Sequence, residues 1–357
     1  MSFLLSWLGL RFSQVPARPR LSCHQNLPSM DSVSVIDKEE VTMAQKLEAR
    51  EQQAQAIAKG IVGEIVDTHT ELMTLTTFEP GEKVNRLLGN LVRLCSATYD
   101  RKTVELVLSD PAVEDIIQSL RVICDTAEAA LEGYWAKQIV EAAKDPSKSH
   151  PDRVLEHVKQ FPYYKNYVEL AKFEIHAIMA VANSIPQKIA FFGSGPMPLS
   201  SLCLLDWMKS ADPSIGLTLD GRRDADRPIE VHNIDLDQQA IERSRNLCLA
   251  LGPKGEGMHF FCDYAGSENQ DLSTFDVVYM AALVGRSQEL KEDIICKIAK
   301  QMKQGAFMVI RSARGMRVCL YPEVDITTKR MMEYLEPCIE AHPWGQVVNS
   351  VIVARRK

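Results

Sequence analysis

Two glycines near the middle of the chain, Gly193 and Gly195, have the spacing that lets a backbone approach a ligand closely. They follow the apolar run 189–192, which is typical of a buried strand, and they precede the helix-like segment 199–208. Glycine tolerates positive φ, and the start of a helix presents free N–H groups. The pattern predicts a crevice for a nucleotide-like ligand at the carboxyl end of a strand. The alternative is a tight strand-to-helix turn, since the third glycine of a dinucleotide motif is absent.

Two acids stand at the ends of the next two predicted strands, Asp235 after 229–234 and Asp263 after 259–262. An acid ending the second strand can accept hydrogen bonds from ribose hydroxyls. An acid ending the third strand can reach an adenine amino group. Each acid could instead cap the following turn or helix. Together with the glycine turn they predict a nucleoside site, which suits S-adenosylmethionine at least as well as NAD.

The composition describes an ordinary globular protein of 357 residues with 46% hydrophobic content and a net charge of −6. The acidic balance argues against a nucleic-acid partner, and no apolar run reaches the ~18 residues that span a bilayer. The nine cysteines are scattered without a C-x-x-C pair, which predicts reduced thiols in a cytoplasmic protein. The eight histidines show no metal-binding spacing, so no metal is expected. We expect a small-molecule substrate, no membrane partner, and a monomer or homodimer.

Three regions follow from the hydrophobic pattern. Residues 1–40 read as a disordered tail or a weak targeting segment, because an apolar stretch is followed by arginines and acids are absent before Asp31. Residues 41–185 read as an all-helical bundle domain, and residues 186–357 as a Rossmann-like domain. Segment 210–227 reads as a surface insertion. The fold class expected is α/β, a doubly wound parallel sheet of the class I S-adenosylmethionine-dependent methyltransferase type, preceded by the helical domain.

Strands and helices alternate in the second half. Strands are expected at 189–192, 229–234, 259–262, 277–280 and 306–310, with helices at 199–209, 237–251 and 287–303. Two further strand-like runs, near 330–341 and 346–353, predict a closing antiparallel hairpin at the sheet edge.

Several separate blocks of this sequence resemble the nicotianamine synthase family. They are FGSGPMPL (192–199), DVVYMAALVG (276–285), RSARGMRVCLYPEVD (311–325), FPYYKNY (161–167) and VVNSVIVA (347–354). The resemblance covers about residues 80–356, in the same order. The chain departs from the plant-type pattern at Met197 and Arg314 and in the longer 210–227 insertion. Arg314 could alter the acceptor site.

The resemblance implies an aminocarboxypropyltransferase that condenses three S-adenosylmethionine molecules to nicotianamine, releasing methylthioadenosine. Glu132, in ALEGY (130–134), matches the family's active-site glutamate and would serve as the general base. It lies within an apolar stripe, so burial should raise its pKa. Tyr167 matches a family tyrosine that would orient the acceptor amine. Glu132 could instead be an exposed flank residue, and Tyr167 simple packing.

The same resemblance supplies the binding residues. The residues expected to bind S-adenosylmethionine are those of the glycine turn and the strand-end acids described above, with Ala281 of the 276–285 block: Gly193, Ser194, Gly195, Asp235, Asp263 and Ala281. For the substrate carboxylates Arg317 is favoured over Arg311 and Arg314, with Tyr321 beside it, although each could brace a loop instead. The alternatives are a small-molecule methyltransferase, a related enzyme with a shorter product, and a nucleoside-binding module without catalysis. A nicotianamine synthase would serve metal homeostasis, because its product chelates transition metals.

Overall fold

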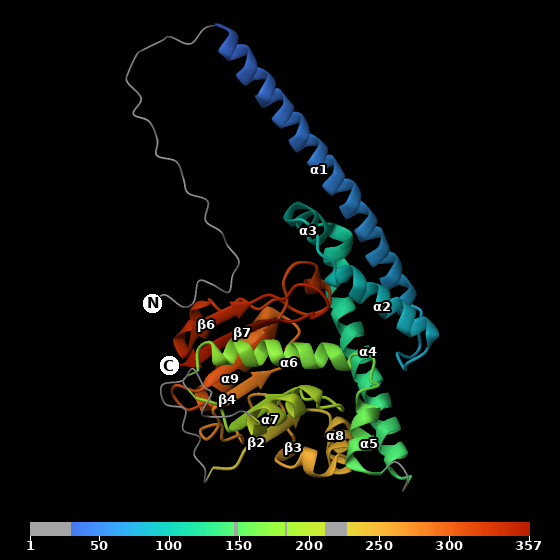
Figure 1. The fold of residues 1–357 in the computed structure, drawn as a ribbon, viewed down its shortest axis with the longest axis vertical. Coiled ribbons are helices and arrows are strands. Elements are labelled where there is room, and N and C mark those ends of the chain that lie inside the picture. The colour runs from blue at the N-terminus through green and yellow to red at the C-terminus, as the bar shows by residue number, and fades with distance from the viewer. Residues whose placement is uncertain (1–29, 146–148, 183, 211–226) are drawn as a thin grey trace, which may run out of the picture. The chain divides into compact units, whose positions relative to one another are not determined.

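The computed structural model describes residues 30–145, 149–182, 184–210 and 227–357, with side chains from Met43 onward. The predicted tail before residue 30 and the body of the predicted 210–227 insertion lie outside these residues. The chain divides into two compact units, Met1–Gln52 and Gln53–Lys357. In the first unit the described residues form the beginning of helix α1 (Met30–Met73), drawn in blue in Figure 1. Met43 and Leu47 of this segment are exposed.

The second unit opens with helices, as the 3.6-residue periodicity predicts. After α1 come α2 (Glu82–Ser96), α3 (Arg101–Leu108), α4 (Pro111–Ala143), α5 (Pro151–Val158) and α6 (Tyr164–Met179). Aspartates start two of them: Asp100 caps α3, and Asp110 caps α4 just before Pro111. Helix α3 was not expected from the sequence, because its eight residues give too short a periodic pattern.

Helices α1 to α4 share an apolar core. Ile65, Leu91, Val107 and Leu120, one from each of α1 to α4, are fully buried in it. The 3₁₀ helix η2 (Gly315–Cys319), which follows the sheet in sequence, contributes to the same core. The helical part therefore packs directly on a loop of the α/β part. The predicted division at residue 185 remains a prediction.

The sheet has seven strands in the order β3-β2-β1-β4-β5-β7-β6. The strands are β1 (Lys188–Phe192), β2 (Glu230–Asp235), β3 (Met258–Cys262), β4 (Val277–Met280), β5 (Phe307–Ser312), β6 (Leu335–Ala341) and β7 (Ser350–Arg356). The first five are parallel, and β7 lies antiparallel between β5 and β6. The doubly wound sheet and its closing antiparallel hairpin are as predicted.

One segment of the predicted hairpin is different. The run near 330–341 begins as helix α10 (Lys329–Tyr334), and only its second half is the strand β6. The hydroxyl of Thr328 accepts a hydrogen bond from the Met331 backbone N–H and so starts the helix. The prediction missed this cap and extended the strand over it.

Helices cover both faces of the sheet (Figure 1). Helix α9 (Gln288–Gln301) packs on one face. Helices α6 and α7 (Leu199–Ser210) pack together on the other. Helix α6 therefore belongs to the core of the sheet, although the sequence placed it with the helical half. No helix among the described residues is long and apolar enough to cross a membrane.

Helix α4 connects the helical part to the carboxyl ends of the strands. It packs against α8 (Gln238–Ala250), which follows β2 (Figure 1). The Arg121 guanidinium of α4 donates two hydrogen bonds, of 3.0 and 2.8 Å, to the carbonyl of Val318 in η2. One long helix is thus held against the turns that follow β2 and β5.

Candidate active site

The turn after β1 requires both of its glycines. Gly193 has φ +76° and Gly195 has φ +67°. A Cβ on Gly193 would lie 2.5 Å from Cγ2 of Val284, in the turn after β4. A Cβ on Gly195 would lie 2.6 Å from Oε2 of Glu132 on α4. The glycines therefore allow both the left-handed backbone and the close approach of the helix carboxylate.

The strand-end acids hold turns and also face a cavity. Asp235 accepts a hydrogen bond of 2.9 Å from the Gly195 backbone N–H and one of 3.0 Å from the Asp237 N–H. Asp263 accepts from its neighbour's backbone N–H and from the side-chain amide of Gln270. The capping alternative thus describes part of what these acids do. Both still line the cavity described next.

A cavity of about 770 Å³ opens at the carboxyl ends of the parallel strands. It is large enough for a small-molecule ligand. All six residues predicted to bind S-adenosylmethionine line it, together with Glu132, Tyr167 and Tyr321. Ser194 Oγ is buried here and meets no partner among the described residues, which leaves it available to a ligand.

Two carboxylates and two phenols meet at the inner end of this cavity. Glu128 and Glu132 lie one turn apart on α4. The hydroxyl of Tyr167 on α6 contacts both carboxylates. It lies 3.0 Å from Oε1 of Glu128 and also forms a hydrogen bond with Oε1 of Glu132. Tyr321 donates to the other oxygen of Glu128 at 3.0 Å. Glu132 is only 6% exposed, so the alternative of a solvated helix flank does not describe it.

The proton count of this cluster is constrained. Tyr167 has one hydroxyl proton but touches two carboxylate oxygens, and an ionised carboxylate can only accept. One of the two contacts therefore needs a proton on a glutamate. The electrostatics agree: desolvation raises the pKa of Glu132 well above its usual range, and the neighbouring Glu128 raises it further. Desolvation also raises the pKa of Glu128. Hydrogen bonds from Tyr321 and Tyr167 act in the opposite direction and lower that pKa in part.

The arginines of the 311–325 block lie in different surroundings. Arg311 is buried and lines the cavity. Its guanidinium donates to Glu174 at 2.6 and 3.1 Å and to Ser200 Oγ at 2.6 Å. Arg314 is exposed. Arg317 lies outside the cavity and donates to the carbonyls of Ser96 and Gly345, at 3.3 and 2.8 Å, so its contacts are those of a loop brace.

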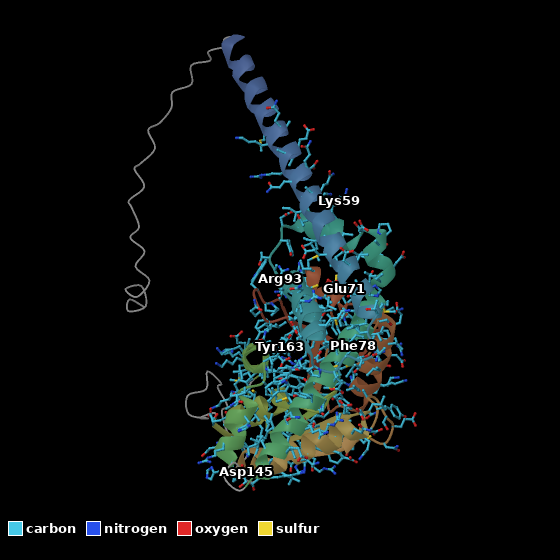
Figure 2. All side chains as sticks on the ribbon, turned by 90° about the vertical axis from the view of Figure 1, so that its right-hand side faces the viewer. Lys59, Glu71, Phe78, Arg93, Asp145 and Tyr163 are labelled. Carbon is cyan, nitrogen blue, oxygen red and sulfur yellow. The ribbon has the colours of Figure 1, made fainter. Side chains whose placement is uncertain are left out.

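A second cavity, of about 530 Å³, lies between α2, α4 and α6. Phe78 and Tyr163, both labelled in Figure 2, are among its lining residues. Six residues line both cavities: Glu128, Glu132, Tyr167, Arg311, Tyr321 and Asn349. The carboxylate cluster therefore lies at the junction of a cavity on the sheet side and a cavity on the helical side.

Two members of this junction were missed or passed over in the sequence. The matched stretch 130–134 does not contain Glu128, although its position four residues before Glu132 places both on one helix face. The motif match favours Arg317 over Arg311, because Arg317 and Tyr321 fall together in the matched block. Only the fold shows that the end of β5 faces the cavity and that η2 turns away from it.

A mainly parallel sheet with a glycine turn, two strand-end acids and a cavity at the carboxyl ends of its strands defines a Rossmann-like protein with a nucleoside-type site. The family model described as "Nicotianamine synthase protein" matches residues 52–357. The chain belongs to this family, as its motifs predicted.

Curated relatives agree over most of the chain. The chain is 32% identical to nicotianamine synthase 2 of Arabidopsis thaliana over 296 residues, which cover 83% of each protein. It is 31% identical to nicotianamine synthase 3 of Oryza sativa subsp. indica over 324 residues, covering 90% of this chain and 84% of the relative. The predicted family and transferase class are thereby confirmed.

Solved structures agree on the fold. A mutant of MtNAS in complex with S-adenosylmethionine is similar with a TM-score of 0.61 and 20% identity, covering 83% of this chain and 97% of that one. MtNAS in complex with MTA and tNA is similar with a TM-score of 0.58, also at 20% identity, covering 86% of this chain and 97% of that one. The Rossmann-like fold with its helical part is therefore shared.

Proposed function

We propose that the chain is a nicotianamine synthase, which condenses three S-adenosylmethionine molecules to nicotianamine and releases three methylthioadenosines. The observation that carries the proposal is the position of Glu132. Its carboxylate is buried against the Gly195 turn, at the junction of the two cavities. The second cavity gives a growing aminocarboxypropyl chain room beyond the reacting centre.

The donor occupies the cavity on the sheet side. The adenosyl part lies over the turn formed by Gly193, Ser194 and Gly195, within reach of Asp235 and Asp263. The sulfonium activates all three carbons attached to it, so the carbon held in line with the nucleophile is the one that reacts. The aminocarboxypropyl arm points toward the junction, where Glu132 stands.

Each transfer is a displacement at carbon. The amine nitrogen of the acceptor forms a bond to the γ-carbon of the donor's arm, the C–S bond breaks, and its electron pair leaves with methylthioadenosine. The amine loses one proton. In the last step the attacking amine and the carbon belong to the same molecule, which closes the azetidine ring. Three C–S bonds break, in agreement with three methylthioadenosines.

Glu132 accepts the amine's proton. An α-ammonium is mostly protonated near neutral pH and cannot attack until it loses a proton. Glu128 and Glu132 share one proton through Tyr167 and titrate as a pair, so Glu132 is ionised and able to accept whenever Glu128 holds that proton. The raised pKa of Glu132 makes it a stronger base than an exposed carboxylate. Tyr167 orients the pair, and Tyr321 holds Glu128.

Substrate carboxylates bind at the edge of the junction. Arg311 lines both cavities and supplies the positive charge there, although Glu174 already engages its guanidinium. Asn349 lines both cavities, and its buried side-chain Nδ2 meets no acceptor among the described residues. We assign carboxylate recognition to Arg311 and Asn349, with Arg317 bracing the loop that carries Tyr321.

The cellular setting belongs to the same proposal. A chelating product assigns the enzyme to metal homeostasis. A cytoplasmic location is supported by the eight described cysteines, all of which are free thiols.

The test is an incubation of the purified protein with S-adenosylmethionine alone, followed by mass spectrometry. The proposal requires nicotianamine and methylthioadenosine in a ratio of one to three. S-adenosylhomocysteine formed only with an added acceptor would indicate a methyltransferase instead, and an uncyclised or shorter product would indicate the related enzyme. No turnover of S-adenosylmethionine alone would overturn the proposal.

A further inference from the structure

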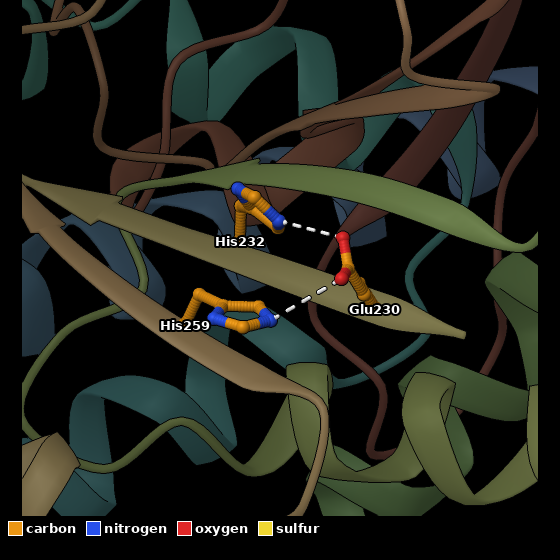
Figure 3. A group of neighbouring side chains, drawn as sticks. All are labelled: Glu230, His232 and His259. Atoms are coloured by element: carbon orange, nitrogen blue, oxygen red, sulfur yellow. Dashed lines mark hydrogen bonds and ion pairs between the residues drawn. The ribbon is translucent and has the colours of Figure 1, made fainter. Parts of the chain in front are cut away.

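A second group of titratable side chains lies at the other end of the sheet. Glu230 and His232 are on β2, and His259 is on β3. Alternate residues of a strand share a face, and the register pairs His232 with His259 across the two strands. All three side chains therefore lie on one face. Figure 3 shows the two imidazoles turned toward the Glu230 carboxylate.

The donor atoms converge closely. His232 Nε2 lies 3.1 Å from one Glu230 oxygen, and His259 Nε2 lies 3.6 Å from the other. The three ligand atoms are all within 4.8 Å of one another. The side chains of Glu230, His232 and His259 are 20, 18 and 44% exposed, so the group is open to solvent on the His259 side.

We propose that Glu230, His232 and His259 bind a divalent transition-metal ion, with Zn²⁺ as the ion that the donor set favours. Two imidazoles and one carboxylate are a common set of protein ligands for Zn²⁺, and water takes the remaining position. The site is separate from the candidate active site. Glu230 begins β2 and Asp235 ends it, and their Cα atoms are roughly 16 Å apart along the strand.

Two aromatic neighbours fix the orientation of one of the proposed ligands. His232 stacks on Phe261 and meets the edge of Phe275, so its ring orientation is fixed before an ion arrives.

One neighbour opposes a cation. Lys188 Nζ lies 3.5 Å from a Glu230 oxygen and also stands over the Phe275 ring. The alternative interpretation is that Lys188, Glu230 and the two histidines form only an ion-pair cluster. The two interpretations differ in what Lys188 does, because its charge weakens a bound cation but strengthens an ion-pair cluster. A Lys188→Met substitution keeps the apolar stem over Phe275 and removes the charge.

The test uses the full chain without S-adenosylmethionine, since the proposed product is itself a chelator. Calorimetric titration with Zn²⁺ is expected to give one tight site per chain, and Co²⁺ to give the intense visible bands of a low-coordinate nitrogen and oxygen site. His232→Asn and His259→Asn are each expected to weaken binding at least tenfold, and Lys188→Met to tighten it. His342→Asn is the matched control. His342 also lies beside a glutamate, with Nε2 3.6 Å from Glu340, but it belongs to no group of three converging ligand atoms among the described residues.

Each outcome decides between the interpretations. Circular dichroism and Tm without metal establish that the variants are folded. If folded His232→Asn and His259→Asn bind Zn²⁺ as tightly as the unaltered chain and the His342→Asn control, the site is elsewhere and the proposal is wrong. The proposal also fails if Lys188→Met does not tighten binding. Loss of nicotianamine formation plays no part in the test, so failure here leaves the proposed function untouched.

Discussion

At the scale of residues, the chemistry depends on how one proton is held between buried groups. Tyr167 contacts two carboxylates and can donate to only one of them, so the pair Glu128 and Glu132 keeps a proton that exposed glutamates would have lost. Burial in the junction raises the pKa of both. Ionising both carboxylates in this buried position would destabilise the fold, and the same raised pKa makes the pair a useful base.

Replacing Glu132 with Gln is expected to lower kcat by about 10² to 10⁴-fold, the usual contribution of a general base, and to leave S-adenosylmethionine binding intact. Product formation measured by mass spectrometry and binding measured by calorimetry separate the two effects. Unchanged turnover would remove Glu132 as the base.

The same variant has a predicted stability signature. The raised pKa of Glu132 means that its contribution to stability is full below the unfolded pKa and is lost as pH rises through the raised folded pKa. Glutamine does not ionise, so Glu132→Gln removes this pH-dependent loss of stability. Its Tm is therefore expected to fall less than that of the unaltered chain between about pH 5 and about pH 9. Parallel Tm curves would show that Glu132 ionises as freely in the fold as outside it.

Replacing Tyr321 with Phe removes a hydrogen bond that lowers the pKa of Glu128. That pKa should rise, and the acid limb of the kcat/KM profile should move to higher pH. Stability should fall by about 1–3 kcal/mol, because a buried carboxylate oxygen loses its donor. Tyr163→Phe, another tyrosine of the helical-side cavity, is the control and should leave the profile in place. A shift of equal size in both variants would contradict a specific role for Tyr321.

At the scale of elements, the site exists because the turn after β1 and the helix α4 come into contact. Gly195 has no side chain, so the Glu132 carboxylate can approach its backbone. Asp235, at the end of β2, accepts from the Gly195 N–H and holds the turn in place. The Arg311, Glu174 and Ser200 network joins β5, α6 and α7 beneath the same junction.

Gly195→Ala is expected to abolish turnover, since the new methyl group would displace the Glu132 carboxylate. The left-handed backbone should also cost roughly 1–2 kcal/mol. Gly305→Ala is the matched control, because Gly305 has φ +79° and open space where its Cβ would be. It should show a similar loss of Tm with normal activity. Equal activity losses in both would indicate general destabilisation instead.

Glu174→Gln is expected to destabilise the fold by about 3–5 kcal/mol, because Arg311 would remain buried without its charged partner. Chemical denaturation measures the loss. The exposed pair Arg101 and Glu105 supplies a control, since Glu105→Gln should cost well under about 1 kcal/mol. A loss as small as that of the control would show that water reaches Arg311.

At the scale of the whole molecule, residues 53–357 form one compact unit that contains both cavities. The family match begins at residue 52. Removing residues 1–42 is therefore expected to leave kcat, KM and Tm unchanged, as measured by product formation and thermal unfolding. A large loss of activity in a folded shortened chain would assign the N-terminal segment a role in catalysis.

Much of this architecture could be predicted from the sequence. Apolar periodicity identified the strands and most helices, because the burial that drives folding repeats every 2 or 3.6 residues. The short helix α3 and the helix α10 escaped, since their local caps outweigh a weak pattern. The placement of α6 on the sheet also escaped, because periodicity shows that a helix has an apolar face but not which surface that face covers.

By itself the sequence determined the glycine turn, the strand-end acids, the family and the candidate base Glu132, because these depend on residue type and order along the chain. Only the tertiary structure decided which polar groups meet at the junction. It brought Glu128 and Arg311 to the cavities and left Arg317 outside. It also brought His232 and His259, from adjacent strands, beside Glu230. Contacts between residues distant in sequence depend on packing and register, which spacing along one chain does not encode.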